Sequence, residues 1–425
     1  MDRSGPIAAG LTGGFVSVLA SRLALGYDSS HIEQTDEWFR HLATPQWAGF
    51  VLAFTAVLMV CFSHSRRWSK LPAVLAVAGP AIIAAPAFIP IAANQALSVT
   101  AFGGGLLLAA TAVAVSCERM GQLGLMIGVL GAILFSGAIR SILPFDEFRY
   151  MQTLGPSHVG AAVHPIALVL AAVVVLAATA RSGVGVGVGV GVPTMTKRVL
   201  GMTLSLPCVY LLLYVSLGST LASPPLWIMS VILAGGATAL AALAIDRHDR
   251  GVLWTGFAIA AATVSGLVWT DRSWWVLVIG VAVLAASTVW GNRIQHGWLG
   301  FAMLVLVTAS GLLTGSQFDV IPTLAYAVVL PAAAGLCVSS HVPVGAASSV
   351  LGPTIPLSLT VFSVSAPAPP TSLYWSNGLA GLGDVSVVEV ISPLPIGIVV
   401  ATFAAIVAAI ANSGHLSTRR KTSES

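Results

Sequence analysis

Long apolar runs separated by short polar breaks make up almost the whole of this chain. A helix needs about 20 apolar residues to cross the hydrocarbon core of a bilayer. By that measure the pattern predicts an all-α polytopic membrane protein with about fourteen transmembrane helices. The predicted spans are 6–26, 46–63, 71–92, 99–116, 121–141, 163–180, 199–220, 224–245, 251–270, 273–290, 297–315, 319–338, 341–364 and 391–411. Three prolines interrupt the thirteenth of these, which makes it the least regular.

Basic residues alternate with the predicted spans as the positive-inside rule requires. With the amino terminus inside, 14 of the 19 Lys and Arg residues fall on the inner side. The inner residues are Arg3, Arg66, Arg67, Lys70, Arg119, Arg181, Lys197, Arg198, Arg247, Arg250, Arg293, Arg419, Arg420 and Lys421. Because one miscounted span in the middle would disturb this alternation, the distribution supports the count. It also predicts that both termini are cytoplasmic.

A Gly-Val repeat divides the predicted spans into two sets. Residues 183–198 hold this repeat, and glycine makes such a segment flexible. We interpret it as a cytoplasmic linker, with an interaction strand as the alternative. The predicted domains are a six-helix bundle at 1–182, a second six-helix bundle at 199–338, and an extra helix pair with a basic cytoplasmic tail at 339–425.

The composition agrees with a membrane location. Of the 425 residues 56% are hydrophobic and 8% are charged, whereas soluble domains carry about 25% charged residues. The lipid bilayer is therefore the expected partner, and the net charge of +4 does not indicate nucleic-acid binding. Lysine is scarce beside abundant Arg, Ala, Gly and Val, which is typical of a GC-rich bacterial genome. We expect a multi-pass protein of a bacterial inner membrane.

Five tryptophans lie near the ends of predicted spans: Trp227, Trp254, Trp274, Trp275 and Trp298. Tryptophan is enriched where helices meet the bilayer interface, because the ring has an apolar body and a polar N–H. The pattern predicts an ordinary aromatic belt.

Several inner loops carry short charged motifs. The loop between the eighth and ninth spans is Asp246-Arg247-His248-Asp249-Arg250-Gly251, and the fifth span begins with Glu118-Arg119-Met120-Gly121. These loops resemble those of the major facilitator superfamily, where Asp-Arg-x-Gly-Arg is usual and Asp249 stands in place of glycine. The resemblance implies two six-helix bundles and transport of a small or lipid-like, amphiphilic molecule by alternating access. Fourteen-span members insert their extra pair between the bundles, whereas here it trails.

The charges of these loops are candidates for a conformational latch. Asp246 can pair with Arg247 or Arg250, or it can cap a helix terminus. Such contacts, together with Arg119 in the earlier loop, can hold the inner face shut and break when the bundles rock. The alternative is that all four are solvated loop charges.

Charged groups at membrane depth are functional candidates by default. Arg22 lies in the outer half of the first span and Arg140 at the outer end of the fifth. Either can hold an anionic group of a substrate, although pairing with outer acids or snorkelling is the alternative. His164, at the head of the sixth span, can titrate, although a lone histidine at a helix start is usually structural. No predicted span carries a carboxylate in its middle, which argues against proton antiport.

A second interpretation uses two outer acidic pairs. Asp36-Glu37 and Asp146-Glu147 are each followed by aromatic residues and arginine. The first pair resembles the first outer loop of membrane-embedded glycosyltransferases that use lipid-phosphate sugars. That resemblance implies a general base at Asp36 or Glu37 and a lipid-phosphate contact at Arg140 or Arg149. A third possibility is a non-catalytic membrane subunit of an envelope complex.

Nothing in the sequence indicates a metal or a cofactor. The four cysteines show no CxxC spacing, and the nine histidines show no ligand spacing on one helix face. We therefore expect the cysteines to pack as small apolar residues. The pattern favours a transporter over an enzyme.

Overall fold

The computed structural model describes residues 4–23, 44–63, 70–89, 93–142, 165–181, 197–218, 224–245, 249–263, 274–294, 296–313, 320–343, 346–359 and 393–412. Every regular element within these ranges is helical. The α-helices are α1 (Ser4–Leu23), α3 (Pro45–Ser63), α4 (Leu71–Ala84), α5 (Ala93–Val115), α6 (Arg119–Ile142), α7 (Pro165–Arg181), α8 (Lys197–Gly218), α9 (Pro224–Ala244), α10 (Arg250–Thr263), α11 (Trp274–Ile294), α12 (Gly297–Ser310), α13 (Val320–Leu324), α14 (Leu330–Ser340), α15 (Ala346–Ser358) and α16 (Pro393–Asn412). Short 3-10 turns follow α4 and α12, namely η5 (Ala85–Ala87) and η7 (Gly311–Leu313).

Each predicted span overlaps one helix or one continuous helical run. In the described ranges, six helical runs are long and apolar enough to cross a membrane: Ser4–Arg22, Gln95–Val115, Arg119–Ile139, Pro225–Ala244, Trp274–Ile294 and Ile321–Ser340. The prediction of an all-α protein with membrane-length apolar helices is thus confirmed for the described residues. That all fourteen helical segments cross the bilayer stays a prediction.

Local chemistry explains where helices depart from the predicted ranges. The thirteenth span is the short helix α15, which begins after Pro343 and contains Pro353 and Pro356. A proline inside a helix removes a backbone hydrogen bond and distorts the turn before it. The twelfth span contains a π-helical turn, η8 (Ala325–Val329), between α13 and α14. Such turns are uncommon and often lie at functional positions.

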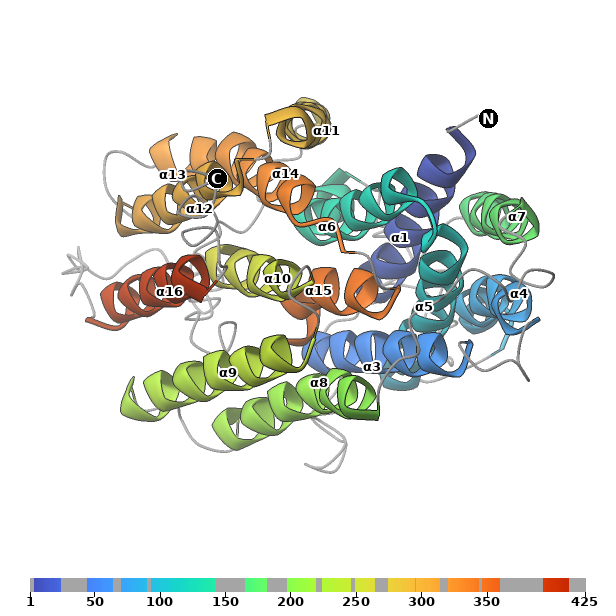
Figure 1. Ribbon diagram of the computed structural model, residues 1–425, viewed down its shortest axis with the longest axis horizontal. Helices are drawn as coiled ribbons and strands as arrows, with labels where there is room; N and C mark the ends of the chain where they lie inside the picture. Colours follow the sequence, from blue (N-terminus) through green and yellow to red (C-terminus); the bar gives the residue numbers. More distant parts are fainter. Residues whose placement is uncertain are drawn as a thin grey trace, which may run out of the picture.

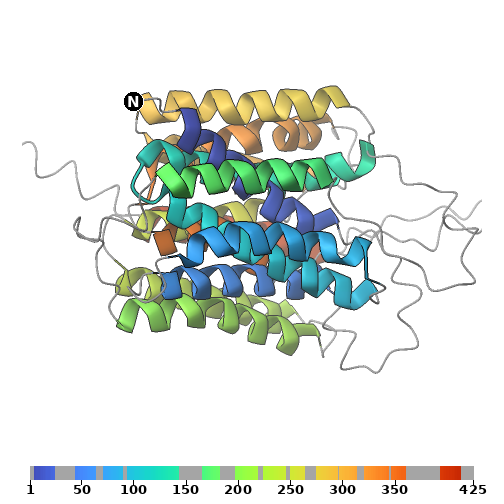
Figure 2. The same ribbon diagram turned by 90° about the vertical axis from the view of Figure 1, so that its right-hand side faces the viewer.

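The helices run side by side in roughly one direction, as Figure 2 shows. One group contains α1 and α3–α7, in which α1 packs on α5 and α6, and α5 packs on α3 and α4. A second group contains α8–α14, in which α11 and α12 pack on α14, and α8 packs on α9. The groups meet directly where α3 contacts α8 and where α6 contacts α11 and α14 (Figure 1).

Helices α10 and α15 lie at the centre of the molecule (Figure 1). Every residue from Gly251 to Ala262 of α10 is buried, and so is all of α15 except Pro356. Helix α15 contacts α10 of the second group as well as α3, α5 and α6 of the first. Helix α16 packs on α10, α12 and α9. The division at 182, 199 and 338 stays a prediction, but α15, assigned to the trailing pair, lies between the two groups.

The α10–α15 contact depends on two glycines. Pro356 has no N–H, so the carbonyl of Gly352 has no helical donor four residues ahead. A Cβ at Gly256 would overlap this carbonyl, and a Cβ at Gly352 would overlap the side chain of Val252. The backbone of α10 at Gly256 therefore lies directly against the Gly352 carbonyl. Backbone meets backbone because neither position carries a side chain.

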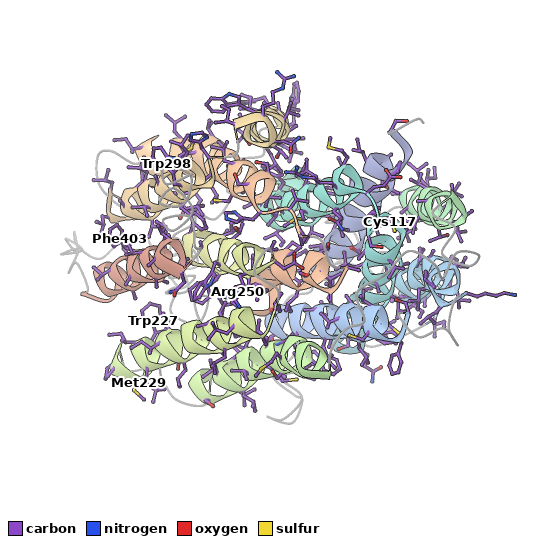
Figure 3. The ribbon with its side chains drawn as sticks, viewed as in Figure 1. Cys117, Trp227, Met229, Arg250, Trp298 and Phe403 are labelled. Carbon is purple, nitrogen blue, oxygen red and sulfur yellow. The ribbon has the colours of Figure 1, made fainter. Side chains whose placement is uncertain are left out.

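Apolar side chains cover the outside of the bundle. Helices α7, α9 and α11 expose large aliphatic residues, including Val173, Ile232 and Val278. Met229 of α9 is labelled on this outer surface in Figure 3. In water such a surface would be a large exposed apolar patch, but in a bilayer it matches the lipid chains. The burial pattern therefore fits a membrane protein.

The tryptophans divide into two classes that the sequence did not separate. Trp274, Trp275 and Trp298 are exposed, as an aromatic belt requires. Trp227 and Trp254 are buried in the protein core instead, and Trp254 packs edge-on against Phe257 at 5.8 Å between ring centroids. The belt prediction is wrong for these two, because tertiary packing covers the helix faces that carry them.

Candidate functional site

Eight of the predicted site residues lie outside the described residues. They are His164, Asp246, Arg247, Asp36, Glu37, Asp146, Glu147 and Arg149. Arg140 lies in the last turn of α6, but its side chain is also outside the described part. Arg22 is half-buried in the last turn of α1, and Arg119 is exposed at the start of α6. Of the predicted latch residues, Arg250 is the one whose side-chain hydrogen bonds the structure describes, and its partners are carbonyls at the end of α9.

Two buried ionisable side chains of the described residues, Asp249 and His341, lie where three central helices begin or end, each beside a buried hydroxyl. We name Asp249, Thr255, His341 and Ser348 the polar junction; all four are buried, each with less than a tenth of its surface exposed. They come from the start of α10, the end of α14 and the start of α15. Among the described side chains, Asp249 is the one buried carboxylate and His341 the one buried imidazole. An ionisable group inside a membrane protein is a functional candidate because burial of charge is costly.

Asp249 joins α10 to α15. It immediately precedes α10, and its backbone carbonyl accepts a hydrogen bond from Val252 N–H at 3.2 Å. Its Oδ2 accepts a hydrogen bond from the hydroxyl of Ser348, in the first turn of α15. The carboxylate therefore lies near the amino termini of two helices, where the partial positive charge of the helix dipole stabilises an anion.

His341 joins α14 to α10 and α12. It ends α14, and its Nδ1 lies 2.9 Å from the carbonyl oxygen of Cys337 and 3.5 Å from the hydroxyl oxygen of Thr255. Its ring packs edge-on against Phe301 of α12, with 5.8 Å between the ring centroids. A Cβ at Gly251 would overlap the imidazole, so the ring lies directly against the first turn of α10. That turn begins next to Asp249.

Arg250 closes the end of α9. Its Nε donates to the carbonyl of Ile245, and its Nη2 donates to the carbonyl of Leu243, each at 3.3 Å. Figure 3 labels Arg250 where α9 meets α10. The last carbonyls of a helix have no helical donors and carry partial negative charge, so a guanidinium there is favourable. The latch prediction expected a carboxylate partner for Arg250; the described partners are backbone carbonyls.

Removing the Arg250 cap should weaken the α9–α10 turn. We expect Arg250→Gln to lower the free energy of unfolding by about 1 kcal/mol, because two charge-assisted hydrogen bonds to carbonyls are lost. Thermal unfolding in detergent micelles measures this as a lower midpoint. The matched control is Arg293→Gln, since Arg293 is an exposed arginine in the last turn of α11. Equal losses for both variants would contradict a capping role.

Sequence reasoning missed the two buried ionisable residues. Asp249 was interpreted only as a replacement for glycine in a loop motif, and His341 as one of nine scattered histidines. A signal was available for Asp249, since it lies at the start of a long and nearly uncharged apolar run, which forms the helix buried from Gly251 to Ala262. For His341 no local signal separates it from exposed His296, because its burial arises from α10 and α12.

The polar junction offers one carboxylate, one imidazole and two hydroxyls. Among the described residues no three His, Cys, Asp or Glu side chains gather in a way that could hold a metal ion. The chemistry available there is binding and transfer of protons and hydrogen bonding to a polar solute. Neither protein-family models nor curated proteins give a match to this chain.

Proposed function

We propose that this protein is an integral membrane carrier that moves a small or amphiphilic molecule by alternating access. The observation that supports the proposal most is helix α15: it is short, contains Pro353 and Pro356, and is buried between two helix groups. In transporters, interrupted helices at the interface of two repeats form the substrate and ion sites. Polar backbone at membrane depth is tolerated where protein or a cavity surrounds it.

The polar side chains of α15 suit such a path. Ser348, Ser349, Thr354 and Ser358 are all buried, and they extend along most of the helix. Thr354 and Ser358 donate hydrogen bonds to carbonyls of their own helix, so their hydroxyls are satisfied within α15. Four buried hydroxyls on one helix cost desolvation free energy that apolar side chains in a lipid-like core would not. Such a helix becomes useful when the groups on either side separate and polar solutes reach it.

The proposal is tested by thiol accessibility at the two ends of α15. Ser349→Cys and Ser358→Cys are made separately in a background without the four native cysteines, and the protein is reconstituted in vesicles. In a carrier, a membrane-impermeant maleimide should label Ser349→Cys from the side of the α9–α10 turn and Ser358→Cys from the opposite side. Both residues are buried in the present conformation, so labelling requires that the helix groups move.

The control for this experiment is Val173→Cys on α7, which is exposed on the outer apolar surface. A thiol in lipid is not ionised and should react slowly despite its exposure. A non-catalytic scaffold predicts that neither α15 position reacts faster than this control, and that outcome would overturn the carrier proposal.

A further inference from the structure

The hydrogen bonding of His341 fixes which ring nitrogen is basic. The carbonyl oxygen of Cys337, 2.9 Å from Nδ1, can only accept a hydrogen bond. Nδ1 therefore carries the ring hydrogen, and in the neutral ring Nε2 holds the lone pair. The ring orientation is fixed as well, because Gly251 and Phe301 contact it. His341 is thus held with a defined proton-accepting atom.

Two negative features lie near the ring of His341. The residue ends α14, where the helix dipole is negative. The ring also lies against Gly251, which follows Asp249 by two positions in the sequence. Burial opposes a positive charge on the ring, so these groups offset a desolvation cost.

In the described part of the chain, few other titratable or charged groups lie on the elements around this ring. Cys337 lies one turn earlier on α14, and Arg250 donates to the carbonyls at the end of α9. The described parts of α9, α12, α15 and α16 contain no charged side chain, and the charged groups nearest the ends of α11 and α6, Arg293 and Arg119, are exposed. Among the described groups, Asp249 and the end of α14 are therefore the ones placed to influence proton binding at His341.

We propose that Nε2 of His341 is the proton-binding site that couples this carrier to a proton gradient, an inference that rests on the proposed transport function. Water at the α9–α10 end supplies a proton to Nε2, and the ring becomes an imidazolium while Nδ1–H keeps its bond to Cys337. Release returns the same proton to water after the helix groups have moved. Attraction between the imidazolium and Asp249 can hold the first turn of α10 near α14. When the ring is neutral, this attraction is lost and the two helices are held less tightly.

The first test is a nitrogen-15 NMR titration of the full-length protein in nanodiscs, with ring-labelled histidine, from about pH 5 to pH 8. We expect the Nε2 signal of His341 to change from that of a protonated nitrogen to that of a bare one, while Nδ1 stays protonated throughout. His341→Asn assigns the signal and preserves a donor toward the Cys337 carbonyl; His341→Gln replaces it should that variant fail to fold. His296→Gln, which alters an exposed histidine, is the control and should leave the signal intact.

The second test joins this titration to the thiol labelling described above. With His341 present in the cysteine-free background, the ratio of Ser349→Cys to Ser358→Cys labelling should change several-fold across the same pH range, and His341→Asn should abolish the change. An Nε2 that stays unprotonated at about pH 5, or a pH response that survives His341→Asn, overturns the proton site while two-sided labelling still supports a carrier. A titrating Nε2 without any labelling of α15 would instead overturn the carrier, and with it the coupling.

Discussion

Replacing Gly256 with alanine is expected to lower the free energy of unfolding by about 3 kcal/mol, since overpacking a tight core usually costs 1–3 kcal/mol and here the obstacle is backbone. The added Cβ would overlap the carbonyl of Gly352, which cannot rotate away as a flexible side chain would. Either α10 and α15 separate or α15 bends further at its prolines. Unfolding by sodium dodecyl sulfate in lipid micelles measures the loss.

The same substitution at Gly236 provides the control. Gly236 is a helical glycine of α9, and nothing lies within 4 Å of the position that its Cβ would take. Alanine there should leave stability unchanged or raise it by up to about 1 kcal/mol, because alanine is the better helix former. If both variants lose stability equally, the close approach of α10 and α15 is not what holds the centre together.

The second large effect is expected at Asp249. Asp249→Ala removes the acceptor of the buried Ser348 hydroxyl and the residue that begins α10, so we expect a loss of about 3 kcal/mol. In a double-mutant cycle with Ser348→Ala, the two losses should fall short of additivity by about 1–2 kcal/mol. The measurement is the same detergent unfolding.

Glu118 is the matched control for Asp249. It is also an acid that immediately precedes a long apolar helix, α6, but it is exposed. Glu118→Ala should change stability by no more than about 0.5 kcal/mol, as is usual for surface substitutions. A coupling energy near zero between Asp249 and Ser348 would show that the bond does not join α10 to α15.

The helices themselves were predictable because they depend on local patterns. An apolar run with few charges forms a helix in a bilayer, since each backbone N–H and C=O must be satisfied within the segment. This reasoning located a helical segment at every predicted span, from α1 to α16. It also anticipated the irregular thirteenth span, because proline acts on its own turn of helix.

The candidate site was not predictable in the same way. Arg22 and Arg140 were chosen because a charge inside an apolar run is visible in the sequence. Asp249 and His341 are separated by 92 positions and lie at helix ends, where charges are common. What distinguishes them is burial, and burial depends on which helices pack over them.

The sequence alone therefore determined the class of protein and the positions of its helices, because hydropathy and proline chemistry act over a single helical segment. Only the tertiary structure decided that α10 and α15 form the centre, that Trp227 and Trp254 face protein, and that Asp249 and His341 lie inside. The reason is physical: in a chain whose helices are apolar on all faces, hydrophobicity does not select neighbours. The close approach at Gly256 and Gly352 and the bond from Ser348 to Asp249 do.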